Sequence, residues 1–378
     1  MYFCRQKEIG FEMSNSVKPK LLFVFSSASR ANFCKSEDEM KRLTALVDHD
    51  WLCLEDLRDK DSKEFLRHGP SEDENSRKLL KDALSGVDAL VMHDGCPKID
   101  SDILKSAPDL KFVCDLEGDR FAFRFNLEDC WAGGVKTIDS NHGVSFPVAE
   151  WALGLILVSL RNAGSFFRKQ IETTSDSGSA EERIKIKDLF GKSVGLVGGG
   201  HIAQRLIGFL KPFECDICVH DPYLPKVVAN VMNFTLTSLE VAMQQDVVVI
   251  LVPITPKTRG MIGVKQLNLL KPGAVFVNVS RGAVVDTDAL VKRLEVGDIV
   301  AGLDVFDPEP IPANHPIKAL TNVFLTPHVA AHGASKITNF SLMIDDLERH
   351  LNGHETLFDL TPQTKANRTG NPPVKSGD

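Results

Sequence analysis

The chain has no surplus of basic residues. Its 378 residues include 44 Lys and Arg against 51 Asp and Glu, which leaves a formal net charge of -7. A protein that holds a polyphosphate backbone usually presents a clear basic excess. We therefore predict that nucleic acid is not a partner.

Long apolar runs are also absent. The longest candidate, near residues 151–160, is shorter than the ~18 to 20 residues that span a bilayer. The first twenty residues mix charged side chains with no apolar core, which is not typical of a secretory signal. We expect a soluble, cytoplasmic protein that does not associate with a membrane.

Cysteine is sparse and scattered, with eight in the whole chain. That spacing excludes the dense disulfide framework of a small secreted domain, so we expect reduced thiols. Cys215 and Cys218 have C-x-x-C spacing, but residues 214–219 are typical of a strand, and buried strand cysteines are the favoured interpretation. We predict no metal site.

The chain does contain short apolar runs that alternate with stretches suited to helices. Runs at 20–25, 90–92 and 112–114 are separated by charged segments long enough for helices. A long apolar helix over 146–160 precedes a second series. Its six strand candidates lie at 194–197, 217–220, 247–252, 274–279, 300–305 and 323–325. This order predicts an α/β protein with two doubly wound parallel sheets, the second having the strands of a dinucleotide-binding domain.

A glycine-rich turn supports that interpretation. The first strand of the second series ends in Gly-Gly-Gly-His-Ile-Ala at residues 198–203, a G-x-G-x-x-A pattern that opens a helix. Gly198 permits the tight turn, and Gly200 lets the backbone approach a pyrophosphate. The N–H groups of His201 and Ile202 would hold the anion. Alone, a glycine triplet is weak evidence, because turns that bind nothing also use glycine.

An acidic residue strengthens the pattern. Asp221 ends the next predicted strand, about 20 residues beyond the glycines, where a carboxylate can accept hydrogen bonds from both ribose hydroxyls. It would repel a 2′-phosphate, so we predict NAD rather than NADP. Taken singly, Asp221 could be a turn residue before Pro222, but the combination favours a nucleotide site.

Three later strands are each followed by a polar side chain suited to catalysis: Arg281, Glu309 and His328. The carboxyl ends of parallel strands share one sheet edge, where α/β folds bind ligands. Histidine exchanges protons near neutral pH, and arginine offers a fork of donors that matches a carboxylate. Each residue alone has an ordinary explanation as a loop, cap or surface turn. Their order downstream of the glycine turn favours a catalytic set.

These segments, together with residues 252–260, resemble the signatures of the D-isomer-specific 2-hydroxyacid dehydrogenases, from about Val148 to His328. The resemblance implies hydride transfer between NAD and C2 of a 2-keto or 2-hydroxy acid. Arg281 would bind the substrate, and His328 would exchange a proton with its oxygen. Glu309 would hold the histidine and favour its protonated form. Further residues implied around the cofactor are Pro253, Thr258, Val279, Ser280 and Asp304.

The resemblance also implies a domain organisation. A Rossmann NAD-binding domain at 146–328 would be inserted into a flavodoxin-like substrate-binding domain at 20–145 plus 329–360. Residues 1–19 and 361–378 have little to bury and are expected to be flexible termini. Because relatives dimerise through the cofactor domain, we expect a homodimer.

The first-domain loop departs from the family pattern. Relatives hold the substrate carboxylate on a glycine-rich loop, and here Gly118 is the glycine that remains, so we predict that it binds substrate. Arg120 or Arg124 replaces the lost donors, or is a solvated surface charge; both interpretations stay open. The phenylalanines in residues 121–125 favour an acid with a larger or aromatic side chain.

An alternative function is an NAD(H)-binding sensor or scaffold that has lost turnover. The altered first-domain loop favours it, whereas the set of Arg281, Glu309 and His328 opposes it. A reductase that uses a Tyr-x-x-x-Lys pair is set aside, because the only tyrosines are Tyr2 and Tyr223.

Overall fold

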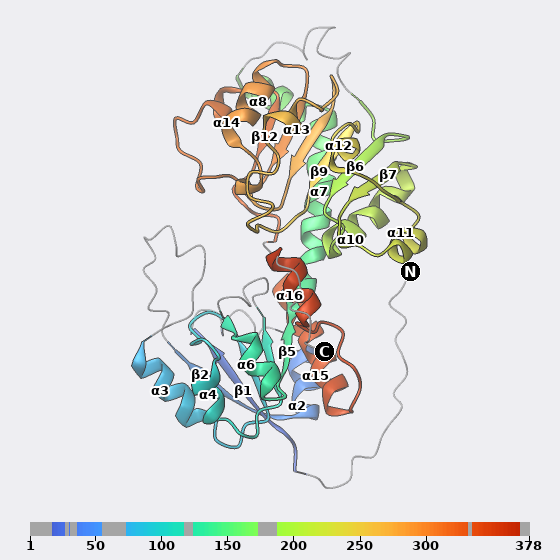
Figure 1. Ribbon diagram of the computed structural model, residues 1–378. Helices are drawn as coiled ribbons and strands as arrows, with labels where there is room; N and C mark the ends of the chain where they lie inside the picture. The colour runs from blue at the N-terminus through green and yellow to red at the C-terminus, as the bar shows by residue number, and fades with distance from the viewer. Residues whose placement is uncertain are drawn as a thin grey trace. The chain divides into compact units, whose positions relative to one another are not determined.

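The computed structural model describes residues 17–26, 30, 36–54, 73–116, 124–172, 187–331 and 335–370. The chain divides into two compact α/β units (Figure 1). Unit 1 comprises Met1–Asp139 and Met343–Leu357, and unit 2 comprises Ser140–Leu342 and Phe358–Asp378. The boundaries expected from the sequence were 145/146 and 328/329, whereas the divisions lie at 139/140 and 342/343, and residues 358–360 fall in unit 2.

Unit 1 is built on five parallel strands in the order β2-β1-β3-β4-β5, which is the flavodoxin-like order. The strands are β1 (Lys20–Phe25), β2 (Asp48–Cys53), β3 (Ala89–Met92), β4 (Phe112–Asp115) and β5 (Lys136–Asp139). Its helices are α2 (Glu37–Leu46), α3 (Glu74–Ala83), α4 (Ser101–Lys105), α6 (Leu127–Ala132) and the second part of α15 (Ser335–Leu351).

The edge strands β2 and β5 lack the apolar run by which a buried strand is predicted from sequence. The central strands β3 and β4 are buried at every position, as expected where helices cover both faces of a parallel sheet. Strand β2 reads Asp-His-Asp-Trp-Leu-Cys and lies at an edge, where it stays partly exposed. Strand β5 lies at the other edge and has only one large apolar residue, Ile138. Edge strands need less apolar surface, so their composition is a poor guide.

Unit 2 is a Rossmann sheet with the order β12-β11-β10-β9-β6-β7-β8. The six predicted strands are confirmed, and the two-residue β8 was missed. The strands are β6 (Ser193–Val197), β7 (Asp216–His220), β8 (Thr235–Leu236), β9 (Val247–Ile250), β10 (Val275–Asn278), β11 (Val300–Leu303) and β12 (Val323–Leu325).

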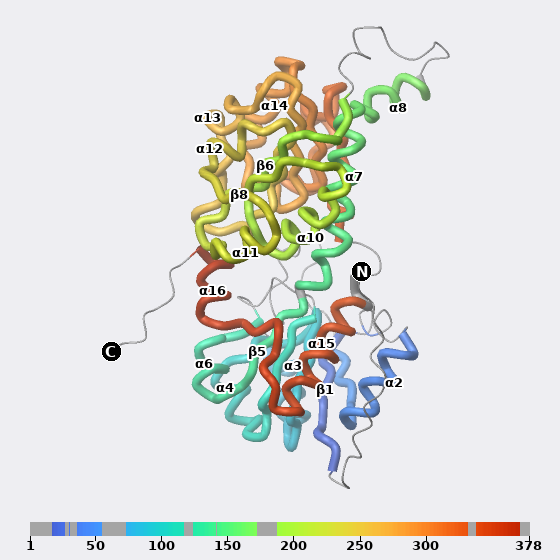
Figure 2. The backbone as a smooth tube through the Cα atoms, turned by 90° about the vertical axis from the view of Figure 1, so that its right-hand side faces the viewer, coloured from blue at the N-terminus to red at the C-terminus, as the bar shows by residue number. Residues whose placement is uncertain are grey.

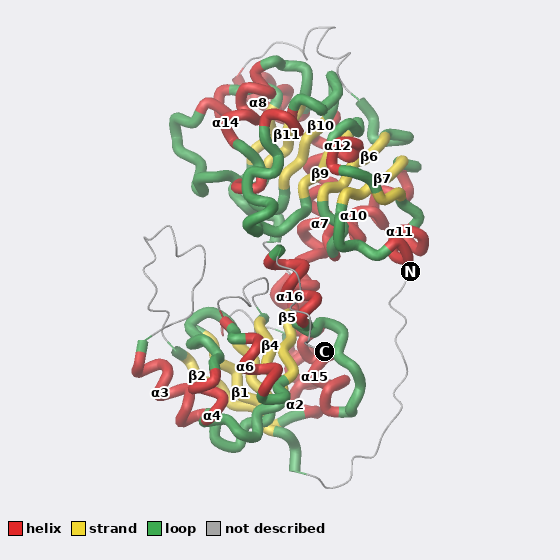
Figure 3. Tube along the Cα trace, viewed as in Figure 1, coloured by secondary structure: helices red, strands yellow, loops and turns green. Residues whose placement is uncertain are grey.

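Helices cover both faces of this sheet (Figure 3). Side chains alternate between the faces, so Val247 and Val249 of β9 join a core with α7 and α10, while Val248 and Ile250 join the opposite core. The helices of unit 2 are α7 (Ser145–Leu160), α8 (Ala163–Glu172), α10 (His201–Leu210), α11 (Lys226–Met232), α12 (Leu239–Ala242), α13 (Val264–Leu267), α14 (Thr287–Glu295) and α16 (Pro362–Thr369), with 3-10 turns η2 (Ser140–Val144), η3 (Lys211–Phe213), η4 (Gly282–Val284) and η5 (Pro316–Ala319).

The helix α7 is the most apolar helix of the unit. By length and composition, His142–Leu160 is long and apolar enough to cross a membrane. Half of that stretch is buried, and Leu155 and Ile156 belong to the core beneath β10 and β11. We conclude that α7 is a core helix of unit 2.

The expectation of a flexible C-terminal segment from residue 361 is wrong for residues 362–369, which form α16 (Figure 2). Thr361 caps the helix, its Oγ1 accepting from the N–H of Thr364 at 3.1 Å, and Pro362 begins it. Gly370 ends it with a φ of +72°. The segment offers little apolar surface beyond Ala366, which explains why its composition suggested disorder. Residues 1–16 and 371–378 lie outside the described residues.

Candidate active site

The predicted site residues of unit 2 follow the carboxyl ends of parallel strands, at one edge of its sheet. The order of strands reverses between β6 and β9, which is the switch point where open α/β sheets bind nucleotides. The residues that follow these strands are Gly198 after β6, Asp221 after β7, Pro253 after β9, Arg281 after β10, Asp304 after β11 and His328 after β12.

The glycine turn has the shape that a dinucleotide requires. Gly198 has a φ of +103°, and a Cβ there would lie 2.9 Å from the carbonyl of Leu251. A Cβ at Gly200 would meet nothing within 4 Å, so its backbone faces open space. Gly200 begins α10 without a side-chain cap, which leaves the N–H groups of His201 and Ile202 to a ligand. The turn therefore fits a pyrophosphate.

Asp221 lies directly beside this turn. Its carboxylate accepts from the backbone N–H of Gly199 and of Tyr223, each at 2.8 Å. The structure thus brings the acidic residue and the glycines together, as the sequence predicted. Its contact with the ribose stays a prediction.

The loop after β9 is held by its own threonines. Thr258 Oγ1 donates to the carbonyl of Pro253 at 2.6 Å and accepts from the N–H of Thr255 at 2.8 Å. Lys257 Nζ lies 3.5 Å from the hydroxyl of Tyr223, which links this loop to the one after β7. Thr258 therefore shapes the loop, while cofactor contacts of Pro253 and Thr258 stay predictions.

His328 and Glu309 form the predicted pair. Nδ1 of His328 lies 2.6 Å from Glu309 Oε1, and the His328 side chain is 41% exposed. A carboxylate on Nδ1 fixes the tautomer, because a carboxylate can only accept, and leaves Nε2 to face a substrate. His328 has a φ of +55°, and its N–H donates to the carbonyl of Asp304 at 2.8 Å.

Asp304 anchors the turn that carries His328. It is fully buried, and its carboxylate accepts from Thr326 Oγ1 at 2.6 Å and from the N–H groups of Val329 and Ala330 at 3.0 Å. Thr326 in turn accepts from the indole N–H of Trp151 at 3.3 Å. The sequence analysis did not predict this anchoring role. The signal for it was an aspartate directly after a buried strand. A nicotinamide contact for Asp304 stays a prediction.

Asn278 shapes the turn that carries Arg281. Its Oδ1 accepts from the N–H and the hydroxyl of Ser280, both at 3.0 Å, and its Nδ2 donates to the carbonyl of Arg281 at 3.1 Å. Arg281 Nη1 donates to the carbonyl of Ser280 at 2.7 Å, and the side chain is exposed. Val279 and Ser280 are buried beneath it. The polar residue at the end of an apolar strand was the signal for Asn278.

In unit 1, Gly118 and Arg120 lie outside the described residues, so the predicted substrate contact of Gly118 stays untested. Arg124 is described, and the interpretation as a solvated surface charge is wrong. Its side chain is 1% exposed, Nη1 donates to the carbonyl of His93, and Nε lies 3.9 Å from buried Asp115. Arg124 therefore joins the end of β4 to the residue that follows β3, since a buried charge requires a partner.

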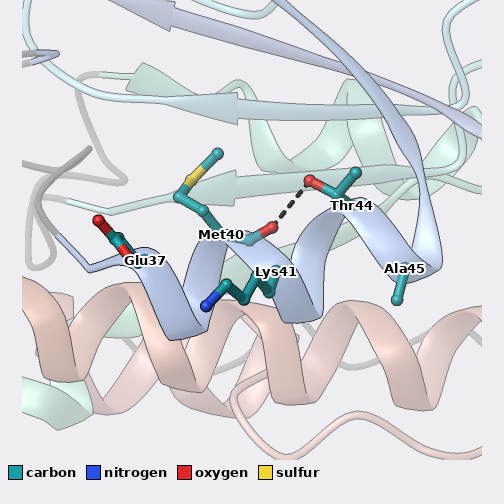
Figure 4. A pocket seen from close by; sticks show the side chains of 5 residues that line it. All are labelled: Glu37, Met40, Lys41, Thr44 and Ala45. Atoms are coloured by element: carbon teal, nitrogen blue, oxygen red, sulfur yellow. Dashed lines mark hydrogen bonds between the residues drawn. The ribbon is translucent and has the colours of Figure 1, made fainter.

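A surface pocket on α2 has no part in this chemistry (Figure 4). It is lined by Glu37, Met40, Lys41, Thr44 and Ala45, with Thr44 Oγ1 donating to the carbonyl of Met40 at 2.8 Å. None of the predicted site residues lines it. Within the described ranges, no group of three or more His, Cys, Asp or Glu side chains could hold a metal ion.

Comparisons with known proteins identify the family of the chain. Residues 153–330 match the model of the D-isomer specific 2-hydroxyacid dehydrogenase, NAD binding domain. The chain is 33% identical to D-3-phosphoglycerate dehydrogenase of Methanocaldococcus jannaschii over 260 residues, covering 68% of this chain and 48% of that protein. It is 31% identical to glyoxylate reductase of Thermococcus gammatolerans over 277 residues, covering 69% of this chain and 79% of that protein. The chain thus spans about half the length of the first relative.

Solved structures agree on the fold. A phosphoglycerate oxidoreductase from Rhizobium etli superposes with a TM-score of 0.75 at 22% identity, covering 90% of this chain and 98% of that one. Sheet order, glycine turn and family match together define an NAD-dependent oxidoreductase with a Rossmann domain. The protein belongs to the D-isomer-specific 2-hydroxyacid dehydrogenase family. The predictions of family, fold class, NAD as cofactor and dehydrogenase class are confirmed.

Proposed function

We propose that this protein transfers a hydride between NAD and C2 of a 2-keto or 2-hydroxy acid, with His328, Glu309 and Arg281 as its catalytic residues. The observation that carries the proposal is the 2.6 Å contact of His328 with Glu309, at the sheet edge that also bears the glycine turn. The nicotinamide supplies the hydride chemistry when bound, so the protein needs to bind, orient and move one proton.

His328 moves that proton. In the direction of reduction, the carbonyl oxygen of the substrate gains negative charge and takes the proton on Nε2 of His328. In the direction of oxidation, Nε2 receives the hydroxyl proton. Glu309 on Nδ1 keeps the ring oriented and stabilises its positive charge in the protonated state.

Arg281 binds the substrate carboxylate. Its guanidinium stays charged at any working pH and offers paired N–H donors that match the two oxygens of a carboxylate. One donor is tied to the carbonyl of Ser280 at 2.7 Å, which restricts the side chain before substrate arrives. Arg281 is exposed where it follows β10.

For the substrate, we propose an acid whose side chain is larger than that of glyoxylate. The phenylalanines of residues 121–125 in the first-domain loop support this. The test is the rate of NADH oxidation across 2-keto acids, from glyoxylate and hydroxypyruvate to phenylpyruvate and hydroxyphenylpyruvate. Higher kcat/KM with the aromatic acids is expected, and higher values with glyoxylate would reject the size argument. NADPH in the same assay tests the preference for NAD that Asp221 implies.

We also propose a homodimer formed through unit 2. Phe167 and Ile171, one turn apart on α8, are 66% and 70% exposed, and Phe190 is 63% exposed. Large apolar side chains on a surface helix favour a covered interface. Sedimentation of the wild type and of Phe167→Asp, Ile171→Asp tests it: a dimer that becomes a monomer is expected, and a wild-type monomer would contradict it.

For location, we propose the cytoplasm, with neither membrane nor nucleic acid as a partner. The net charge of -7 and the burial of α7 support this. Cell fractionation followed by immunoblotting would test it. Recovery in the soluble cytoplasmic fraction is expected, and recovery with membranes or inside an organelle would contradict it.

A further inference from the structure

The helix α16 lies against the loop that follows β9. Gly370, which ends the helix, is buried, and a Cβ at this position would lie 3.1 Å from Thr255 Oγ1 and 3.7 Å from Lys257 Cδ. Thr255 and Lys257 belong to the loop predicted to border the cofactor. A C-terminal segment that sequence reasoning assigned to disorder therefore packs on the nucleotide-binding edge of unit 2.

The segment leading into α16 is linked to the start of α10 through His142. The ring of Phe358 lies 4.6 Å from that of His142, which lies 3.5 Å from the ring of His201 at the start of α10. Arg368 of α16 is close enough to His201 that its charge, after desolvation, helps to lower the pKa of His201 to about 4. The stretch from Phe358 to Gly370 thus borders the loops after both β6 and β9, on either side of the switch point.

The glycine turn has no charged side chain to pair with the negative pyrophosphate of the cofactor. A dinucleotide pyrophosphate carries two negative charges. At neutral pH His201, the first residue of α10, is uncharged because of its lowered pKa. Arg205 one turn later stacks 3.8 Å from the ring of Phe146. By contrast, α16 carries Lys365 and Arg368 and no acidic residue.

We propose that α16 is a strap over the dinucleotide site and that Arg368 binds the pyrophosphate of the cofactor. The proposal rests on NAD binding and does not depend on the turnover proposed above. An eight-residue helix is marginal by itself, and Ala366 is the one residue of α16 that is buried. Contact between Arg368 and a phosphate would therefore order the strap when the cofactor binds.

Equilibrium binding of NADH, followed by its fluorescence, tests the role of Arg368. Arg368→Gln is expected to raise the Kd about tenfold, the effect of losing one charge-assisted hydrogen bond. Arg368→Lys should retain most of the affinity, and Lys292→Gln, an exposed charge on α14, should retain all of it. Binding of ADP-ribose should weaken with that of NADH, whereas adenosine, which lacks the phosphates, should bind Arg368→Gln as it binds the wild type.

Hydrogen exchange tests the strap itself. Amides of residues 362–369 should exchange more slowly after NADH is added to the wild type, and should lose this protection in Arg368→Gln. A thermal melt of each variant separates a local effect from unfolding. Unchanged NADH affinity in a folded Arg368→Gln would overturn the proposal, and tighter binding would show that α16 obstructs the site. Absence of turnover in a wild type that binds NADH would leave the strap intact and reject only the proposed activity.

Discussion

The backbone of Gly282 packs so closely on the carbonyl group of Phe306 that no Cβ fits between them. Gly282 follows Arg281, and Phe306 lies three residues before Glu309. The contact fixes the turn after β10 against the segment after β11. It therefore sets the arginine and the carboxylate of the proposed catalytic set relative to each other.

Gly282→Ala is expected to separate these two segments. A methyl forced into a packed position costs about 1–3 kcal/mol and displaces the backbone. We expect kcat/KM to fall by roughly tenfold or more, because a small displacement of a catalytic group lowers the rate strongly. Steady-state kinetics would measure it, with the exposed-glycine variant Gly208→Ala as control, where a Cβ meets nothing within 4 Å. Equal activity of both variants would contradict the account.

Glu309→Gln keeps a hydrogen-bond acceptor near Nδ1 of His328 but removes the negative charge. The protonated imidazole then loses its charged partner, so we expect kcat to fall at least about tenfold, less than the roughly 10²- to 10⁴-fold expected when the acid–base group itself is removed. NADH affinity should stay the same, because Glu309 follows a different strand from the glycine turn. A normal kcat in this variant would show that the 2.6 Å contact has no catalytic role.

Asp304→Ala removes the buried acceptor of the His328 turn. Three donors, from Thr326, Val329 and Ala330, would lose their partner, which should destabilise the protein by about 3 kcal/mol. Chemical denaturation would measure the loss. Asp288→Ala, at an exposed position on α14, is the control and should change stability little. Similar values for both variants would mean that the turn is held by other contacts.

The titration of His201 offers a test in solution. Desolvation, then the charges of Arg368 and Arg205, lower its pKa to about 4. Removing one of those charges in Arg368→Gln should raise the pKa toward 6.5, as an NMR titration of imidazole signals would show. An unchanged value would place Arg368 away from the glycine turn.

The lowered pKa of His201 also makes the stability of the protein depend on pH. Between pH 6.5 and about 4, His201 binds a proton in the unfolded chain but not in the folded protein. The free energy of unfolding therefore falls as the pH falls through this window. By its surface area His201 is an exposed residue, and water screens the charges around it, so we expect only a small effect on stability. His201→Asn should flatten the pH dependence of unfolding in this range.

The strands buried on both faces were the clearest to predict from the sequence. Strands β9 and β10 are buried at every position, and the glycine turn follows β6 directly, so pattern and spacing located them. Strands β2 and β8 carry little such information, because one lies at an edge and the other has two residues. The helix α16 was missed because caps and a tertiary contact at Gly370, rather than an apolar face, hold it.

For the site, residue type predicted which side chains carry chemistry but not which ones position them. The segments that carry Glu309 and His328 follow the neighbouring strands β11 and β12, and the family resemblance implied that the two side chains pair. The anchoring by Asp304 and Asn278 did not, because hydrogen bonds to backbone groups of a neighbouring turn depend on the folded geometry. The burial of Arg124 likewise depends on Asp115, the last residue of β4, and on His93, which follows β3.

The most direct test compares the wild type with His328→Ala for NADH binding and for NADH oxidation by 2-keto acids, on the same preparations. The account predicts turnover of at least one acid by the wild type, a loss of roughly 10²- to 10⁴-fold in the variant, and equal NADH affinity in both. NADH binding by a wild type that oxidises it with no acid would contradict the account and identify a nucleotide sensor or scaffold instead.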